Sequence, residues 1–174
     1  DKMMEANTRY AQGGIASVMN LDNDSFENHI SDTLIAGDGI CNEEAVELMV
    51  KDAPNLINEL IDFGVRFTEK EDGLDLGREG GHSNNRIVHT VDATGYEVES
   101  VMLKKVKDHP NITILEYHFA MDLLTEHHLG RTVTATSETH CFGAYVLDSK
   151  KGKVQRVISK VTVLASGGIG QVYQ

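Results

Sequence analysis

Paired glycines are the feature that most constrains this chain. Sixteen of its 174 residues are glycine, and they pair at Gly13-Gly14, at Gly80-Gly81 and at Gly167-Gly168. Glycine tolerates positive φ and lets the backbone approach a ligand closely. Each pair therefore predicts either a plain turn or a loop that faces a ligand, and the flanking residues have to decide between the two.

Between the glycine pairs, apolar residues recur at helical spacing. Ser25 and Asn42 are expected to act as N-caps, because their side chains can accept from the first free backbone N–H groups. Pro54 should stop or kink the second helix, since proline removes a hydrogen bond; a further helix then restarts and ends at Gly64. The predicted helices are 25–37, 43–52, the further helix from Pro54 to its cap at Gly64, and 95–108. We expect these residues to face the core: Phe26, Ile30, Thr33, Leu34, Val46, Met49, Val50, Leu56, Ile57, Leu60, Ile61, Val98, Val101, Met102 and Val106.

Other segments have the short apolar patterns of strands. The predicted strands are 65–67, 86–89, 112–117, 119–125, the pair 141–148 and 153–159, and the continuous apolar run 161–165, which is typical of a buried strand. Helices and strands alternate without repeats, which indicates an α/β or α+β domain. The chain starts in a polar stretch and stops just after a glycine-rich turn, so we expect a piece of a larger domain.

Charge and composition exclude several classes of protein. The formal net charge is −11, which argues against nucleic acid or anionic lipid as a partner, because a phosphate backbone requires clustered Lys and Arg. No apolar run approaches the roughly 20 residues of a membrane helix. Cys41 and Cys141 make no disulfide framework, so a cytoplasmic location is expected.

Three segments could carry chemistry. Residues 78–95 place a carboxylate, glycines, an imidazole, a hydroxyl and guanidinium groups together, which suits either a small polar ligand or a surface ion-pair loop. Residues 7–14 could hydrogen-bond a planar heterocycle lying on the backbone, although alone they suit an ordinary polar turn. The third segment is the apolar run and turn at 161–168, where an α/β sheet often meets a cofactor.

No standard metal or nucleotide motif is present. His127-His128 with His140-Cys141 does not have the spacing of a zinc site, and no metal is expected. The sequence after Gly168 continues to Gly170 but has Tyr173 where a G-x-G-x-x-G motif needs its third glycine.

Taken in order, these segments resemble the L-aspartate oxidase family of the succinate dehydrogenase and fumarate reductase flavoprotein group. The resemblance covers nearly the whole chain, and the combination of YAQGG, DTLIAG and REGGHS distinguishes the aspartate-oxidising branch. The matching segments are 10–16 (YAQGGIA), 32–37 (DTLIAG), 39–41 (GIC), 78–83 (REGGHS), 86–89 (RIVH), 92–95 (DATG), 109–111 (HPN) and 163–168 (VLASGG).

The resemblance implies an α/β fold, an incomplete FAD-binding domain of the fumarate reductase flavoprotein type, with a mixed sheet and flanking helices. Residues 1–174 would be the middle segment of that domain, without the N-terminal GxGxxG unit and the capping and C-terminal domains. We therefore expect this chain alone to bind FAD weakly or not at all and to be inactive.

The resemblance also assigns site residues. Glu79 would recognise the amino group of aspartate, and His82 and Ser83 would line the same region. Asn7 replaces the serine common in the family, and Ser166 stands where threonine is more frequent. The residues implied to bind FAD are Asn7, Thr8, Arg9, Tyr10, Ala11, Gln12, Gly13, Gly14, Gly167 and Gly168.

The implied activity is oxidation of L-aspartate to iminoaspartate in NAD biosynthesis, with O2 or fumarate as electron acceptor and quinolinate synthase as a downstream partner. Two alternatives stay open from the residues. One is a fumarate reductase or succinate dehydrogenase flavoprotein fragment, and the other is a non-catalytic binding domain derived from a flavoprotein.

Overall fold

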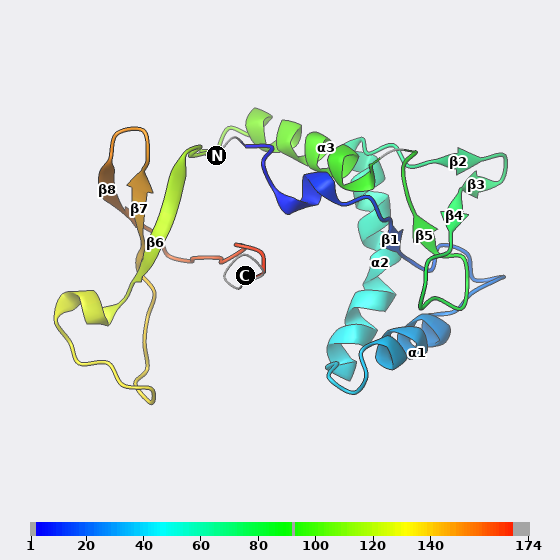
Figure 1. Cartoon of the computed structure of the whole chain (residues 1–174), viewed down its shortest axis with the longest axis horizontal. Coiled ribbons are helices and arrows are strands. Elements are labelled where there is room, and N and C mark those ends of the chain that lie inside the picture. The colour runs from blue at the N-terminus through cyan, green and yellow to red at the C-terminus, as the bar shows by residue number, and fades with distance from the viewer. Residues whose placement is uncertain (1–2, 92, 169–174) are drawn as a thin grey trace. The chain divides into compact units, whose positions relative to one another are not determined.

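The computed structural model describes residues 3–91 and 93–168 (Figure 1). They form two compact units, one of residues 4–112 and the other of residue 3 with residues 113–168. Helices and small sheets occur together, which confirms the α/β class. Every strand pair among the described residues is antiparallel. Asp92 and Gly170, which belong to predicted motifs, lie outside the described residues.

The first unit contains the α-helices, the 3-10 helix η1 and two small sheets. None of the described helices combines the length and the apolar character needed to cross a bilayer. The elements of the first unit are η1 (Asn7–Tyr10), β1 (Ile15–Ala16), α1 (Phe26–Ala36), α2 (Glu43–Phe63), β2 (Glu69–Lys70), β3 (Gly73–Leu74), β4 (Leu76–Gly77), β5 (Ile87–Val88) and α3 (Thr94–Asp108).

The predicted helix caps are confirmed. Ser25 Oγ accepts from the backbone N–H of Asn28 at 3.1 Å, and Asn42 Oδ1 accepts from that of Ala45 at 2.9 Å. Each bond satisfies an N–H group that has no partner within its helix. Gly64 ends α2 with a φ of 107°, a left-handed conformation that glycine adopts without a steric penalty.

The predicted break at Pro54 is wrong, because α2 is one continuous helix with Pro54 inside it. Val46, Val50, Ala53 and Ile57 follow one another at helical spacing on both sides of the proline, and all four are buried. Burying this single stripe outweighs the one hydrogen bond that proline removes.

The core of the first unit lies where α2 and α3 meet the strand β5. It is built from Ile57, Val65, Phe67 and Val88, with Val98 and Val101 of α3 packed against it. Residues 65–67 do not form the predicted strand. The alternation of buried and exposed side chains is nevertheless confirmed, because Val65 and Phe67 are buried and Arg66 is exposed. Three residues expected in the core are exposed because they lie off the buried stripe of α2: Met49, Leu56 and Ile61.

The predicted strand over 86–89 is confirmed in its centre. β5 lies between β1 and β4 in a three-stranded sheet, with Val88 opposite both Ile15 and Leu76 (Figure 1). Residues 69–85 contain the short strands β2, β3 and β4, which no predicted strand covered.

The second unit is a three-stranded antiparallel sheet in the order β6-β7-β8 (Figure 1). Its elements are β6 (His118–Leu124), the 3-10 helix η2 (Glu126–Leu129), β7 (Gly143–Asp148) and β8 (Lys153–Ile158). The predicted pair at 141–148 and 153–159 and the strand near 119–125 are thereby confirmed.

Two predicted strands of the second unit are not formed. Residues 112–117 are irregular, and so are 161–165, where Val161 is 77% and Val163 81% exposed. An apolar run becomes a buried strand only when neighbouring strands take its backbone hydrogen bonds. No described segment of this chain pairs with residues 161–165.

Replacing Pro54 with Ala restores the missing backbone donor in α2. We expect Pro54→Ala to raise the free energy of unfolding by about 1–3 kcal/mol, measured by urea denaturation followed by far-UV circular dichroism. Pro110→Ala is the matched control, because Pro110 lies outside the helices and should leave the stability nearly unchanged. An equal or smaller gain at Pro54 would contradict this account of α2.

Candidate functional site

The glycine-containing loop 7–14 is held against the N-terminal end of α3. The backbone N–H of Gly95 donates to the carbonyl of Ala11 at 3.1 Å. A Cβ atom at position 95 would lie 1.8 Å from the carbonyl oxygen of Thr8. Only glycine permits this approach, so the first turn of α3 fixes the backbone of the predicted FAD loop.

The loop presents polar groups that the rest of the described chain does not use. Asn7, Thr8 and Gln12 are exposed, and none of their side chains has a hydrogen-bond partner among residues 3–91 and 93–168. Amide and hydroxyl groups of this kind can both donate and accept. They are therefore available to a polar ligand.

Arg9 and Tyr10, by contrast, are engaged within the protein. The Arg9 guanidinium lies 5.8 Å from the ring centroids of both Tyr10 and Tyr96, within the range of a cation–π contact. The Tyr10 hydroxyl donates to Glu5 at 2.6 Å. The contact of Arg9 with Tyr96 strengthens the attachment of η1 to α3, whereas Tyr10 is bound to Glu5, just before η1.

Glu79, from the second predicted loop, reaches the glycine pair of the first. The backbone N–H of Gly14 donates to Glu79 Oε1 at 3.4 Å. A Cβ atom at position 13 would lie 3.4 Å from the same oxygen, and one at position 14 would lie 2.4 Å from the carbonyl oxygen of Val88. The absence of side chains at both positions lets the loop lie against β5 and leaves room for the carboxylate.

A buried arginine anchors the loop that carries Glu79. Arg86 is fully buried. Its Nε and Nη2 donate to the two carboxylate oxygens of Asp24 at 2.7 and 2.8 Å, and its Nη1 donates to Asp32 at 2.6 Å. The two carboxylates accept from the forked donors of the guanidinium group and neutralise its charge. Without these partners, burying the charge would be costly.

Asp32 connects this arginine to the predicted site residue Ser83. The backbone N–H and the hydroxyl of Ser83 both donate to Asp32 Oδ2 at 2.7 Å. Burial alone would raise the pKa of Asp32, but the hydrogen bonds from Ser83 and Arg86 prevail and lower the pKa to about 2. Asp32 is therefore ionised at neutral pH and fixes the end of the loop to α1.

His82 lies beside the same arginine. Its Nδ1 is 3.3 Å from Arg86 Nη1, and its ring meets that of His29 edge-on at 5.7 Å between centroids. His29 is the buried residue of α1. Burial, followed by the charge of Arg86, lowers the pKa of His29 and keeps its imidazole neutral.

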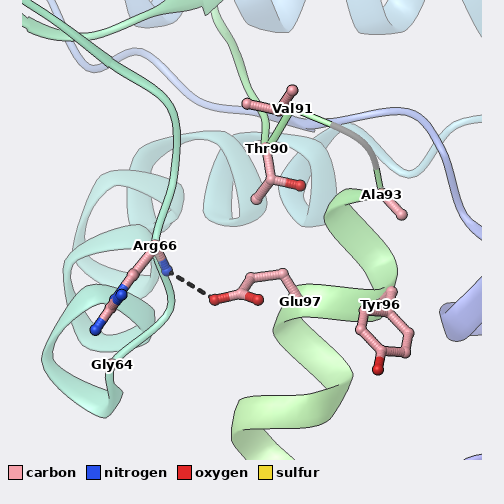
Figure 2. Close-up of a pocket in the computed structure, with 7 residues that line it drawn as sticks. All are labelled: Gly64, Arg66, Thr90, Val91, Ala93, Tyr96 and Glu97. Atoms are coloured by element: carbon pink, nitrogen blue, oxygen red, sulfur yellow. Dashed lines mark hydrogen bonds between the residues drawn. The ribbon is translucent and has the colours of Figure 1, made fainter.

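A separate hollow of about 590 Å³ opens at the start of α3 (Figure 2). In Figure 2 the backbone N–H of Arg66 donates to Glu97, at 3.3 Å. The hollow is lined by Gly64, Arg66, Thr90, Val91, Ala93, Tyr96 and Glu97. It contains none of the predicted site residues, and the candidate site is therefore the junction of loops 7–14 and 78–86.

The remaining sequence candidates lie in the second unit. Gly167 and Gly168 are in an exposed, irregular stretch, and Gly167 has a φ of 74°. His140 Nδ1 lies 2.7 Å from Glu126, and His128 Nε2 lies 3.2 Å from Asp122. Within the part of the chain that the structure describes, no three His, Cys, Asp or Glu side chains gather as metal ligands would.

Sequence reasoning missed the members of the buried cluster that lie outside the glycine loops. Asp24 and His29 were not singled out, and Asp32 and Arg86 were noted only within motifs. Asp24 is 62 positions from Arg86 in the chain, so local spacing carries no sign that they meet. The one sequence clue to the cluster is Arg86 itself, a charged residue that directly precedes the apolar strand residues 87–88.

The hydrogen bonds to Asp32 predict an acid-sensitive contribution to stability. Because its pKa falls from 3.8 to about 2 on folding, the carboxylate stabilises the fold above pH 4 and loses that effect as the pH drops toward 2. Asp32→Asn should lower the free energy of unfolding at pH 7 by about 1.5–3 kcal/mol and weaken its pH dependence between 4 and 2. Urea titrations across this range measure both effects. The exposed Asp62→Asn is the control, and equal losses in the two variants would refute the prediction.

Comparisons with known proteins identify the family of the chain. The FAD binding domain family matches residues 2–174. The chain is 46% identical over 170 residues to a chloroplastic L-aspartate oxidase of Oryza sativa, covering 97% of this chain and 25% of that protein. It is 48% identical over 172 residues to L-aspartate oxidase 1 of Ralstonia nicotianae, covering 97% of this chain and 31% of that protein.

Solved structures share the fold. A mutant FrdA of E. coli quinol fumarate reductase has a TM-score of 0.85 at 29% identity, over 98% of this chain and 27% of that chain. A Mycobacterium smegmatis Sdh1 complex has a TM-score of 0.84 at 25% identity, over 98% and 30%. The chain spans between a quarter and a third of the curated relatives it matches. With a match that extends over nearly all of its residues, the chain belongs to the FAD binding domain family.

Proposed function

We propose that this chain is part of an FAD-dependent L-aspartate oxidase, a middle segment of its FAD-binding domain. The reaction converts L-aspartate to iminoaspartate, the first step of de novo NAD biosynthesis through quinolinate. Relatives at 45–48% identity that carry the name L-aspartate oxidase support this proposal. Because the chain covers only part of their length, we assign the activity to a protein of the relatives' full length.

The residues of loop 7–14 fit a flavin. The free polar side chains of Asn7, Thr8 and Gln12 offer donors and acceptors, and Gly13 leaves the backbone open on the side that Glu79 approaches. FAD, when bound, supplies the two-electron oxidation, and the protein contributes binding and orientation. The part of the site that includes Gly167 and Gly168 stays a prediction.

The observation that carries the choice of substrate is the carboxylate of Glu79 beside Gly13-Gly14. Glu79 is exposed, and the weak 3.4 Å contact with the Gly14 N–H is the only hydrogen bond of its carboxylate within residues 3–91 and 93–168. A carboxylate in that position attracts the ammonium group of an amino acid. A dicarboxylate without an amine would leave Glu79 unpaired and would be repelled, so the same group binds aspartate and disfavours succinate.

The proposal also covers the electron acceptor, the enzyme that consumes the product and the cellular compartment. We infer O2 or fumarate as the electron acceptor and quinolinate synthase as the consumer of iminoaspartate. The thiols of Cys41 and Cys141 are both free, which suits a reducing compartment such as the cytoplasm. The plant relatives are named as chloroplastic proteins.

A fumarate reductase or succinate dehydrogenase flavoprotein is the second candidate, favoured by the TM-scores of 0.84–0.85. The two candidates differ in their response to aspartate. We would record the anaerobic visible spectrum of the natural-length flavoprotein before and after adding L-aspartate or succinate. Bleaching of the flavin by aspartate alone supports the proposal, whereas bleaching by succinate alone, or no response to aspartate, contradicts it.

Glu79→Gln removes the charge proposed to select the amino acid. In the natural-length enzyme we expect kcat/KM for aspartate to fall roughly tenfold to a hundredfold, since a charged hydrogen bond is lost, and succinate to become a better ligand. Steady-state kinetics with both compounds measure the ratio. Glu71→Gln is the matched control, because Glu71 is an exposed acid in the turn between β2 and β3. An unchanged preference in Glu79→Gln would overturn the role given to Glu79.

A further inference from the structure

The contact between Arg86 and His82 determines where the imidazole can carry its proton. Arg86 Nη1 lies 3.3 Å from His82 Nδ1. A guanidinium group only donates hydrogen bonds, so this contact is favourable when His82 Nδ1 is unprotonated and accepts. The proton of a neutral His82 is then on Nε2.

The arginine cannot adapt to a different tautomer. Arg86 is fully buried, and Asp24 and Asp32 hold its Nε, Nη1 and Nη2. Asp32 is itself bound by Ser83, the neighbour of His82 in the chain. A proton on His82 Nδ1 would place two donors against each other, at the cost of an unmade hydrogen bond.

His82 Nε2 is free to meet a ligand. His82 is half-buried, and its Nε2 has no partner among the described residues, whereas its backbone N–H donates to the carbonyl of Glu79 at 3.3 Å. One turn therefore carries a carboxylate, which can accept from an ammonium group, and an N–H donor, which can bind a carboxylate. Aspartate has both of these groups.

We propose that His82 binds a carboxylate of the substrate as a neutral Nε2–H donor, and that Arg86 is the positioning residue that selects this tautomer. The identity of the ligand rests on the proposed function, whereas the tautomer does not. His82 moves no proton in this scheme; it orients the amino acid while Glu79 pairs with the ammonium group.

The tautomer can be measured without substrate. The natural-length protein labelled with 15N-histidine would be studied by NMR at pH 7, with the His82 resonances assigned from their loss in His82→Gln. We expect a protonated Nε2 and an unprotonated, hydrogen-bonded Nδ1. A protonated Nδ1, in either a neutral ring or an imidazolium, would overturn the role of Arg86. This result is independent of whether the protein oxidises aspartate.

Two substitutions then test the role of the Nε2–H group. The amide of His82→Gln can still donate near the position of Nε2, so we expect KM for aspartate to stay within about threefold; His82→Leu cannot donate, and KM should rise roughly tenfold to a hundredfold with little change in kcat. His109→Gln, at an exposed position after α3, is the control for the substitution itself.

The other outcomes separate the hypotheses. A loss of kcat by about a hundredfold or more in both His82 variants would show proton transfer by His82 and refute the donor role. An unchanged KM in His82→Leu would refute the carboxylate contact even if the tautomer is as expected. If the unmodified protein does not oxidise aspartate, the proposed function fails, and the NMR result alone decides the tautomer.

Discussion

The ion cluster around Arg86 is the interaction on which the candidate site depends. A fully buried guanidinium is stable only with its donors paired, and here Asp24, Asp32 and Ser83 meet that requirement. Asp24 lies just before α1, Asp32 lies within α1, and Ser83 lies in the loop after β4. The cluster therefore joins three stretches of the chain at one point and fixes the turn that carries Glu79 and His82.

Glycines set the second constraint, because they determine how closely the two loops approach their supports. Gly95 brings α3 against loop 7–14, and Gly14 brings the same loop against β5. In each case a side chain would overlap a backbone carbonyl. The resulting junction places a carboxylate beside an open stretch of backbone. That arrangement suits a planar cofactor with an amino acid next to it, as the proposed function requires.

The extent to which the fold could be predicted depended on the range of the interactions. Caps at Ser25 and Asn42 and the end of α2 at Gly64 are local, and they were confirmed. Pro54 was misjudged because the buried stripe that keeps α2 whole is a tertiary effect. Residues 161–165 were misjudged because a strand needs a neighbour, and composition alone does not supply one. The pairing of the two glycine loops likewise had no local sign beyond their residue types.

By itself, the sequence determined the α/β class, the caps and the glycine loops, and the family resemblance predicted Glu79, His82 and Ser83 as site residues. The tertiary structure decided which groups meet them. Asp24, Asp32 and Arg86 come together across 54 to 62 positions of the chain, and the tautomer proposed for His82 follows from that contact. The physical reason is that hydrogen bonds and burial act over a few ångströms in space, whereas sequence patterns report only neighbours along the chain.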